Sequence, residues 1–261
     1  MLRVAVLASG SNGNAVYVES EETRLLVDAG VSAKQIEERL RHLGRSAAEL
    51  DAVFLTHEHS DHVAGLRVLC GRHELPLYAN APTFAAARGA VREIERRETI
   101  RSGESFRVGD CEVTSIRVSH DAAEPVCYVI ESRGVRFGVF TDLGVPGEEV
   151  ERTLATLDGA VVETNHDVEM LRAGPYPEIL KNRIESSRGH LSNVQARDLL
   201  ANHASARLRC VFLGHLSEEN NTGMKALAAA REAAAAKRSL DGLRPVLSSR
   251  YATTALIALA T

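Results

Sequence analysis

The sequence contains no tryptophan, and aromatic residues make up only 4% of its 261 positions. A platform of several aromatic side chains that stacks nucleic-acid bases is therefore not expected. The chain also lacks an uninterrupted apolar run of about 18 residues, the length that a membrane-spanning helix needs. Its 31 basic and 35 acidic residues give a formal net charge of -4. This balance excludes attraction of nucleic acid by overall charge and leaves only a local basic surface for that purpose.

Cysteine is scarce and widely spaced, at positions Cys70, Cys111, Cys127 and Cys210. The absence of a C-x-x-C pair argues against a zinc knuckle and a disulfide framework, so we expect reduced, buried thiols. The first apolar run is interrupted by Arg3 and ends at Ser9. No export signal is predicted, and we expect a cytoplasmic protein without membrane contact.

Strand-like apolar runs and helical periodicities occur in both halves of the chain. No proline-rich linker or long repeat divides them, so we predict one compact domain, residues 1–261, built of two similar layers. A last pair of strands is expected near 245–258. The helices expected after the first quarter of the chain include 83–98, 177–187, 192–203 and 221–238. In the helix 83–98, Arg88, Arg92 and Arg96 would share one face.

The segment from Thr56 to His62, THEHSDH, is the most informative part of the sequence. It follows an apolar strand and precedes a helix. Alternate side chains of an extended backbone point the same way, so His57 and His59 can bind one metal ion. Asp61 and His62, where the chain turns into the helix, would face a neighbouring position. Because histidine is the commonest transition-metal ligand, this cluster predicts metal binding.

Three further polar residues each follow an apolar strand, as expected for ligands at one sheet edge. They are His120, Asp142 and His215. With the first cluster they complete two ligand sets: His57, His59 and His120 for one metal ion, and Asp61, His62 and His215 for the other. Asp142 would lie between the two ions. A closed structural zinc site needs only four ligands, so seven predict a catalytic centre with two divalent ions and room for water.

This pattern, together with Asp28 in the sequence LVDAG, resembles the metallo-β-lactamase superfamily. Four segments resemble more narrowly the WalJ/YycJ subfamily: residues 8–14, 56–62, 163–167 and 189–193. The resemblance implies an α/β fold of four layers, an αββα sandwich with the metals at one edge between two sheets. It also implies a 5′-to-3′ exonuclease for double-stranded DNA, with zinc or manganese as the ions.

The resemblance also assigns roles to residues outside the ligand sets. Asp28 would support the ligand histidines; the alternative is a turn-forming aspartate before Gly30. Glu163 and His190 are similar to a pair that tRNA-processing ribonucleases of this superfamily use on the leaving group. His190 would be the general acid, oriented by Glu163. Alternatively, His190 is an ordinary residue at the start of a helix capped by Ser192.

The sequence leaves the substrate-binding residues open. His166, flanked by Asn165 and Asp167, either lines a phosphate pocket together with Asn165, or Asn165 and Asp167 cap a short helix. Two arginine-rich groups could contact DNA or be ordinary solvated helix faces. These groups are Arg88, Arg92, Arg96 and Arg97, and Arg172, Lys181, Arg183 and Arg188.

The predicted activity is two-metal hydrolysis of phosphodiesters in DNA, with Asp61 and Asp142 orienting the nucleophilic water. Two other enzyme classes remain open, because a glyoxalase II-like thioesterase or a small cyclic phosphodiesterase uses the same kind of metal set. A non-enzymatic alternative is a metal-stabilised adaptor in a repair or signalling assembly. The sequence does not indicate the oligomeric state or the identity of a protein partner.

Overall fold

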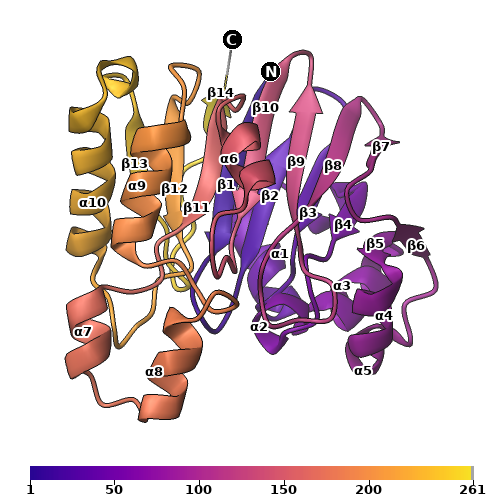
Figure 1. Ribbon diagram of the computed structural model, residues 1–261. Helices are drawn as coiled ribbons and strands as arrows, with labels where there is room; N and C mark the ends of the chain where they lie inside the picture. The colour runs from indigo at the N-terminus through magenta and orange to yellow at the C-terminus, as the bar shows by residue number, and fades with distance from the viewer. Residues whose placement is uncertain (260–261) are drawn as a thin grey trace.

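The computed structural model describes residues 1–259, and two seven-stranded sheets pack face to face within this range (Figure 1). The first sheet has the spatial order β14 (Ile257–Leu259), β1 (Leu2–Ala8), β2 (Ala15–Glu19), β3 (Arg24–Val27), β4 (Ala52–Phe54), β5 (Leu77–Asn80), β6 (Arg97–Ile100). The second has the order β13 (Arg244–Leu247), β12 (Cys210–Gly214), β11 (Gly159–Glu163), β10 (Val135–Phe140), β9 (Val126–Ser132), β8 (Cys111–Arg117), β7 (Ser105–Val108).

Helices cover the outer face of each sheet (Figure 1). Those on the side of the first sheet are α1 (Ala33–His42), α2 (Ser60–Val63), α3 (Leu66–His73), α4 (Ala81–Ala86) and α5 (Arg88–Val91). The second sheet is covered by α6 (Glu148–Leu154), α9 (Asn193–His203) and α10 (Gly223–Ala236). Two short helices, α7 (Val168–Ala173) and α8 (Glu178–Glu185), lie beyond the edge of the sheets. Short 3-10 turns occur at Ala47–Glu49 and Arg238–Leu240.

Three separate apolar clusters hold these layers together. One fills the space between the sheets, and the other two lie between each sheet and its helices. In β1, for example, Val4 and Val6 face the other sheet while Ala5 and Leu7 face the helices. Strands buried on both faces must be apolar throughout, which explains the continuous apolar runs in the sequence. The arrangement confirms the predicted αββα sandwich.

Two local predictions were wrong. The expected helix 83–98 is divided into α4 and α5, and the chain then enters β6 at Arg97, so the arginines at 88, 92 and 96 share no helix face. Pairing of β6 with β5 outweighs the helical periodicity there, because tertiary contacts override weak propensity. The last two strands, β13 and β14, do not pair but lie in different sheets.

Other expectations were confirmed. All four cysteines are buried and unpaired. Burial raises the pKa of the Cys70 thiol to about 12, which keeps it protonated and unreactive. No helix among residues 1–259 is both long enough and apolar enough to cross a bilayer.

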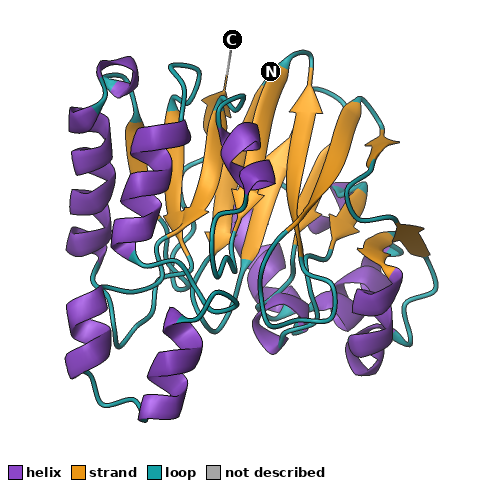
Figure 2. Cartoon of the chain, in the orientation of Figure 1, coloured by secondary structure: helices purple, strands orange, loops and turns teal. Residues whose placement is uncertain are grey.

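The topology gathers several strand ends at one edge. Strand β3 runs parallel to β4, and β10, β11 and β12 run parallel to one another. The loops that follow these strands therefore leave the sheets on the same side, seen as the loop cluster in the lower part of Figure 2. Polar side chains in these loops can meet although they are far apart in sequence.

A buried carboxylate at the end of β2 makes the stability of this fold depend on pH. Glu19 is 2% exposed and accepts hydrogen bonds from Arg45, Arg3 and the Tyr17 hydroxyl. Burial alone would raise the pKa of Glu19, but these hydrogen bonds outweigh it and lower the pKa to about 2. A depressed pKa in the folded state stabilises the fold above the unfolded pKa of about 4.3 and loses that effect as pH falls toward 2.

We therefore expect Glu19→Gln to lower the free energy of unfolding by about 3 kcal/mol at pH 7, and by less than half of that at pH 3. Urea unfolding at both pH values measures the difference. Glu21→Gln is the matched control, because the Glu21 side chain is 52% exposed in its pair with Arg133 and surface pairs contribute little. A loss for Glu19→Gln that is the same at both pH values would contradict the prediction.

Candidate metal centre

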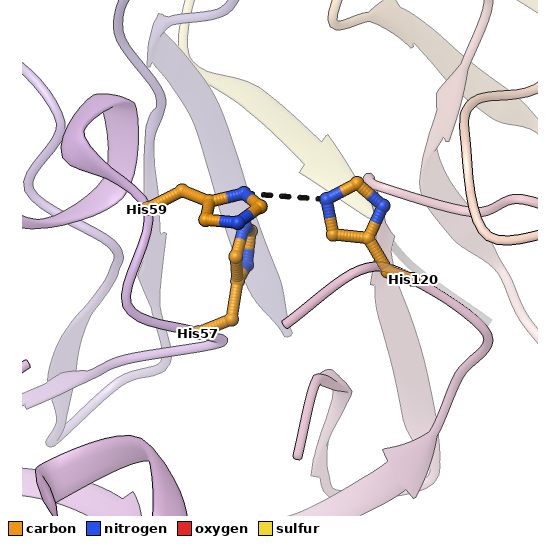
Figure 3. Close-up of side chains that lie close together, drawn as sticks. All are labelled: His57, His59 and His120. Carbon is orange, nitrogen blue, oxygen red and sulfur yellow. Dashed lines mark hydrogen bonds between the residues drawn. The ribbon is translucent and has the colours of Figure 1, made fainter. Parts of the chain in front are cut away.

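Three histidines from two loops converge at the loop edge of the sandwich (Figure 3). His57 follows β4, His59 precedes α2, and His120 lies beyond the end of β8. One ring nitrogen from each lies within 4.8 Å of the others, and Nε2 of His120 is 3.3 Å from Nδ1 of His59. His57 and His120 are buried, whereas His59 lies at the rim. The structure thus brings together the first predicted ligand set.

The second predicted set, Asp61, His62 and His215, also converges. Oδ2 of Asp61 lies 3.4 Å from Nε2 of His62 and 3.3 Å from Nε2 of His215. Asp142, at the end of β10, lies between the two sets. Its Oδ2 is 3.2 Å from Nε2 of His62, and its Oδ1 is 3.7 Å from Nε2 of His120.

The hydrogen bonds of the histidines fix which nitrogen faces this centre. Nδ1 of His62 donates to Asp28, Nδ1 of His120 donates to the Gly189 carbonyl, and Nδ1 of His215 donates to Glu163. In each ring the other nitrogen, Nε2, is therefore the unprotonated atom of the neutral form and points inward. This orientation by a second partner is the usual arrangement of metal-binding histidines.

Two atoms in the centre are buried without a hydrogen-bond partner, Nε2 of His57 and Oδ2 of Asp142. Burying a polar atom without a hydrogen-bond partner costs free energy, so the free lone pair on each of these two atoms needs an explanation. A cation bound among imidazole nitrogens and carboxylate oxygens would satisfy both. The two sets are therefore suited to divalent metal ions, and the donor types fit zinc or manganese.

The electrostatics of the centre follow from its burial. Burial lowers the pKa of His57 well below its ordinary value, and neighbouring histidines lower it further, so this ring is neutral. Burial acts in the same direction on His62 and His215, but adjacent carboxylates outweigh it and raise their pKa values. For Asp142, burial is outweighed by His215 and His62, which hold the pKa of this carboxyl well below its usual range. The carboxylate is therefore ionised, as a metal ligand must be.

Left-handed backbone marks three of the residues at this centre. Asp28, Asp142 and His215 have φ angles of 61°, 62° and 56°. Such angles are uncommon outside glycine, and they concentrate at functional sites where the surrounding structure imposes them. Asp28 and His215 directly follow β3 and β12, and Asp142 lies two residues after the end of β10. In each case the turn redirects the side chain into the centre.

Asp28 forms hydrogen bonds that hold the segment Thr56–His62 in place. Its Oδ1 accepts a hydrogen bond from the backbone N–H of Thr56 at 2.9 Å, and its Oδ2 accepts one from Nδ1 of His62 at 2.7 Å. The Thr56 hydroxyl lies 2.9 Å from the same Oδ2 and 3.0 Å from Nδ1 of His57. Asp28 thus does more than form a turn, because it connects β3 to His62 directly and to His57 through Thr56.

Glu163 holds two histidines at once. Its Oε1 accepts from Nδ1 of His190 and from Nδ1 of His215, each at 2.8 Å. Its Oε2 accepts from the backbone N–H groups of Leu143 and Leu191. Burial alone would raise the pKa of Glu163, but the two histidines outweigh it and lower the pKa to about 2. The sequence predicted the contact with His190 but missed the one with His215.

The alternative interpretation of the His190 loop is also partly realised. Ser192 caps α9 in a capping box with Gln195, as expected for a residue that starts a helix. His190 itself is nevertheless bound to Glu163 and lines a cavity beside Asp142 and His215. The cap and the contact with Glu163 therefore coexist.

The two remaining predicted residues have different positions. Asn165 lines the cavity and donates to the carbonyl oxygen of His215 at 2.9 Å. His166 instead lies in a bridge beside Ser192, is buried, and is not among the residues that line the cavity. Asp167 caps α7, which the alternative interpretation of this segment predicted.

Within residues 1–259, half of the eight residues in the two arginine-rich groups form ion pairs with acidic side chains: Arg92, Arg172, Lys181 and Arg183. Arg92 lies near Glu93, whereas Arg172 and Arg183 pair with Glu185 and Asp121. Only the second group is near the centre, because Arg183 lines its cavity. The first group lies on and beyond α5, below the right-hand side of the sandwich in Figure 1.

Asn14 is a site residue that the sequence interpretation missed. Its Nδ2 lies 3.2 Å from Oδ2 of Asp61, and its Oδ1 accepts from the backbone N–H of Gly10. The loop between β1 and β2 therefore positions the second ligand set. Residues 8–14 are one of the segments that resemble the WalJ/YycJ subfamily, but neither this resemblance nor their polar, glycine-rich character indicated a contact partner for Asn14.

Gly30 has no room for a side chain. A Cβ atom there would lie 1.6 Å from the carbonyl oxygen of Asp61, and the Gly30 N–H donates to the Asn14 carbonyl. We expect Gly30→Ala to lower the free energy of unfolding by at least about 3 kcal/mol and to reduce metal binding, since the Asp61 backbone must move. Thermal unfolding and elemental analysis of the purified variant measure both effects.

Gly71→Ala is the matched control, because Gly71 lies in α3 with no atom within 4 Å of an added Cβ. It should raise stability by up to about 1 kcal/mol through helix propensity. Equal stability and metal content of the Gly30→Ala variant and the unchanged protein would contradict the prediction.

The comparisons with known proteins agree with this geometry. The family model described as a β-lactamase superfamily domain matches residues 23–215, which include all seven predicted ligands. The chain belongs to this superfamily.

Exodeoxyribonuclease WalJ of Streptococcus pneumoniae is 39% identical over 224 residues, which cover 84% of this chain and 83% of that protein. Exodeoxyribonuclease YycJ of Bacillus anthracis is 39% identical over 87% of this chain and 86% of its own. The chain is therefore a WalJ/YycJ-like member of the superfamily of metal-dependent hydrolases.

Solved structures show the same fold at lower identity. Zinc-bound PqqB from Methylobacterium extorquens superposes with a TM-score of 0.70 at 18% identity, over 97% of this chain and 99% of that one. The short form of human tRNase Z gives a TM-score of 0.65 at 15% identity, over 99% of this chain and 100% of the other. At these identities the likeness establishes the fold alone.

Proposed function

We propose that this protein is a two-metal DNA exonuclease that shortens double-stranded DNA from the 5′ end. The observation that carries the proposal is the convergence of two ligand sets on Asp142, with His190 and Glu163 beside them. The relatives named exodeoxyribonuclease, which align over most of the chain, support the choice of DNA. We take residues 1–261 to act as one domain, of which residues 260 and 261 lie outside the described part.

His57, His59 and His120 would hold one ion, Asp61, His62 and His215 the other, and Asp142 would contact both. When bound, such ions lower the pKa of water and neutralise the charge that develops on the phosphate. Asp61 is well placed to orient the attacking water, because Asn14 fixes its carboxylate at the rim of the cavity.

The leaving group would be handled by His190. Nδ1 of His190 is held by Glu163, so Nε2 is the nitrogen available to the cavity. As the water oxygen bonds to phosphorus and the bond from phosphorus to the leaving oxygen breaks, the proton on Nε2 would pass to that oxygen. The hydrogen bond to the buried Glu163 carboxylate holds the ring in the orientation that this transfer needs.

The test is hydrolysis of end-labelled duplex DNA by protein treated with chelator and then resupplied with manganese or zinc. Metal-dependent shortening from the 5′ end is the expected result. Cleavage of a small phosphodiester such as bis(4-nitrophenyl) phosphate, with intact DNA, would instead support a small-molecule phosphodiesterase. Hydrolysis of thioesters alone would support the thioesterase, and folding that depends on metal with no activity would support the adaptor.

A further inference from the structure

Three apolar side chains at α8 are not explained by core packing: Leu180 and Ile184 lie on the helix, and Tyr176 lies just before its N-cap, Pro177. Tyr176, Leu180 and Ile184 are spaced by four residues and are half-buried. None of the three belongs to the apolar clusters that hold residues 1–259 together. Ile179, the residue before Leu180 on the helix, is 87% exposed and points away from the other three side chains. The spacing of four between Leu180 and Ile184 is typical of a helix face that packs on a core, yet here these two side chains and Tyr176 face something else.

These side chains line the cavity of the metal centre. The cavity has a volume of about 380 Å³, and His59, Asp142 and His190 also line it. This volume lies within the range of small-molecule binding sites. Figure 1 shows α8 on the side of the sandwich where the loops that carry the ligands emerge. The apolar face of α8 is therefore continuous with the site of the proposed reaction.

The contacts of α8 fix this wall relative to the metal centre. Arg183 on the helix pairs with Asp121, which follows His120. Beyond the helix, Arg188 donates to the His120 carbonyl, and the Ser119 hydroxyl donates to the Ser187 carbonyl at 2.7 Å. The backbone N–H of His190 donates to the carbonyl of Ile184 at 3.0 Å. The helix is thus tied at several points to the segments that carry His120 and His190.

The position of His190 indicates which part of a DNA substrate meets this wall. In cleavage from a 5′ end, the bond that breaks joins phosphorus to O3′ of the terminal nucleoside. If His190 stands next to that oxygen, the terminal nucleoside lies on the same side of the phosphate, between His190 and α8. The side chains next to it there include an aromatic ring and two branched aliphatic chains, which suit the faces of a base. Arg183, a basic group of the same wall, is paired with Asp121.

We propose that Tyr176, Leu180 and Ile184 form the subsite for the base of the nucleoside that is released, with the Tyr176 ring stacked on the base. This inference rests on the proposed function and adds to it the place of the leaving nucleoside. Stacking on one aromatic ring tolerates any base, so the subsite would select for the presence of a base without selecting its identity. The low aromatic content of the chain is no obstacle, because one released base needs one ring.

The test compares two duplexes that differ only at the 5′-terminal residue, which is thymidine in one and an abasic tetrahydrofuran residue in the other. Tyr176→Ala is expected to lower kcat/KM about tenfold for the thymidine end, equivalent to about 1.4 kcal/mol. It should leave kcat/KM for the abasic end unchanged, because there is no base to lose its contact. Leu180→Asn should act in the same way, and the matched control Ile179→Ala should change neither substrate.

Equal losses on both ends would overturn the subsite, since they would mean a general disturbance of the wall. The absence of any loss would overturn it as well. Calorimetric titration with thymidine 5′-monophosphate and with 2-deoxyribose 5-phosphate provides a second measurement that needs no hydrolysis. Tighter binding of the nucleotide, abolished by Tyr176→Ala, is expected, and equal affinities would contradict the proposal.

This binding comparison separates the two proposals. If the protein hydrolyses neither duplex, the exonuclease proposal fails, whereas the base subsite is still supported or rejected by the two titrations. If the duplexes are hydrolysed with equal efficiency by all variants, the exonuclease proposal stands and the subsite is rejected.

Discussion

Replacing Asp142 with alanine is expected to lower kcat/KM for duplex DNA by at least about a thousandfold. Removing a residue that only supports a ligand already costs about 10- to 100-fold, and Asp142 is placed to contact both ions. Its two oxygens face His62 on one side and His120 and His215 on the other. Metal bound per chain, measured by elemental analysis after dialysis, should fall with the activity.

Asp142→Asn separates charge from shape, because it keeps the side-chain volume and removes the ionised oxygen. It should lose nearly as much activity as the alanine variant. Asp167→Ala is the control outside the centre, since Asp167 caps α7 and pairs with Lys225. It should cost about 1 kcal/mol of stability and leave metal content unchanged. Full activity of Asp142→Ala with two ions bound would refute the proposed ligand sets.

The residues of the candidate centre were predictable where their position depends on local sequence. The alternation of His57 and His59, and the polar residues directly after apolar strands, indicate a shared sheet edge without any knowledge of the fold. What could not be predicted are the individual hydrogen bonds by which residues outside the ligand sets hold the ligands from distant segments. Glu163 contacts His215 across 52 positions, and Asn14 contacts Asp61 across 47. Such contacts depend on strand order, which periodicity does not determine.

The error at the expected helix 83–98 has a related cause. The arginine spacing from 88 to 96 has a helical period, but strand pairing at the sheet edge uses the residues that follow it. The opposite case occurs at α8, where the apolar period is correct and the helix exists, yet its apolar face lines the cavity of the centre. Hydrophobic periodicity predicts a helix or strand and which of its faces is buried. Only the fold shows what that face packs against.

His190→Ala is expected to lower kcat for duplex DNA by about 10²- to 10⁴-fold while metal content stays unchanged, because a general acid contributes this much without binding the ions. The loss should nearly vanish with thymidine 5′-(4-nitrophenyl phosphate), whose leaving nitrophenolate needs no proton. His203→Ala is the matched control, since His203 lies at the end of α9 near Glu151 and outside the centre.

This pair of substrates distinguishes two roles that the geometry allows. His190 also lies within 4.8 Å of Asp142, Glu163 and His215 in an arrangement that could bind a cation. A histidine that binds metal would, when removed, lower hydrolysis of both substrates and the amount of bound metal together. A histidine that protonates the leaving oxygen would, when removed, slow only the substrate with the poor leaving group. Equal losses on the two substrates would therefore exclude the proton donor and assign His190 to the metal.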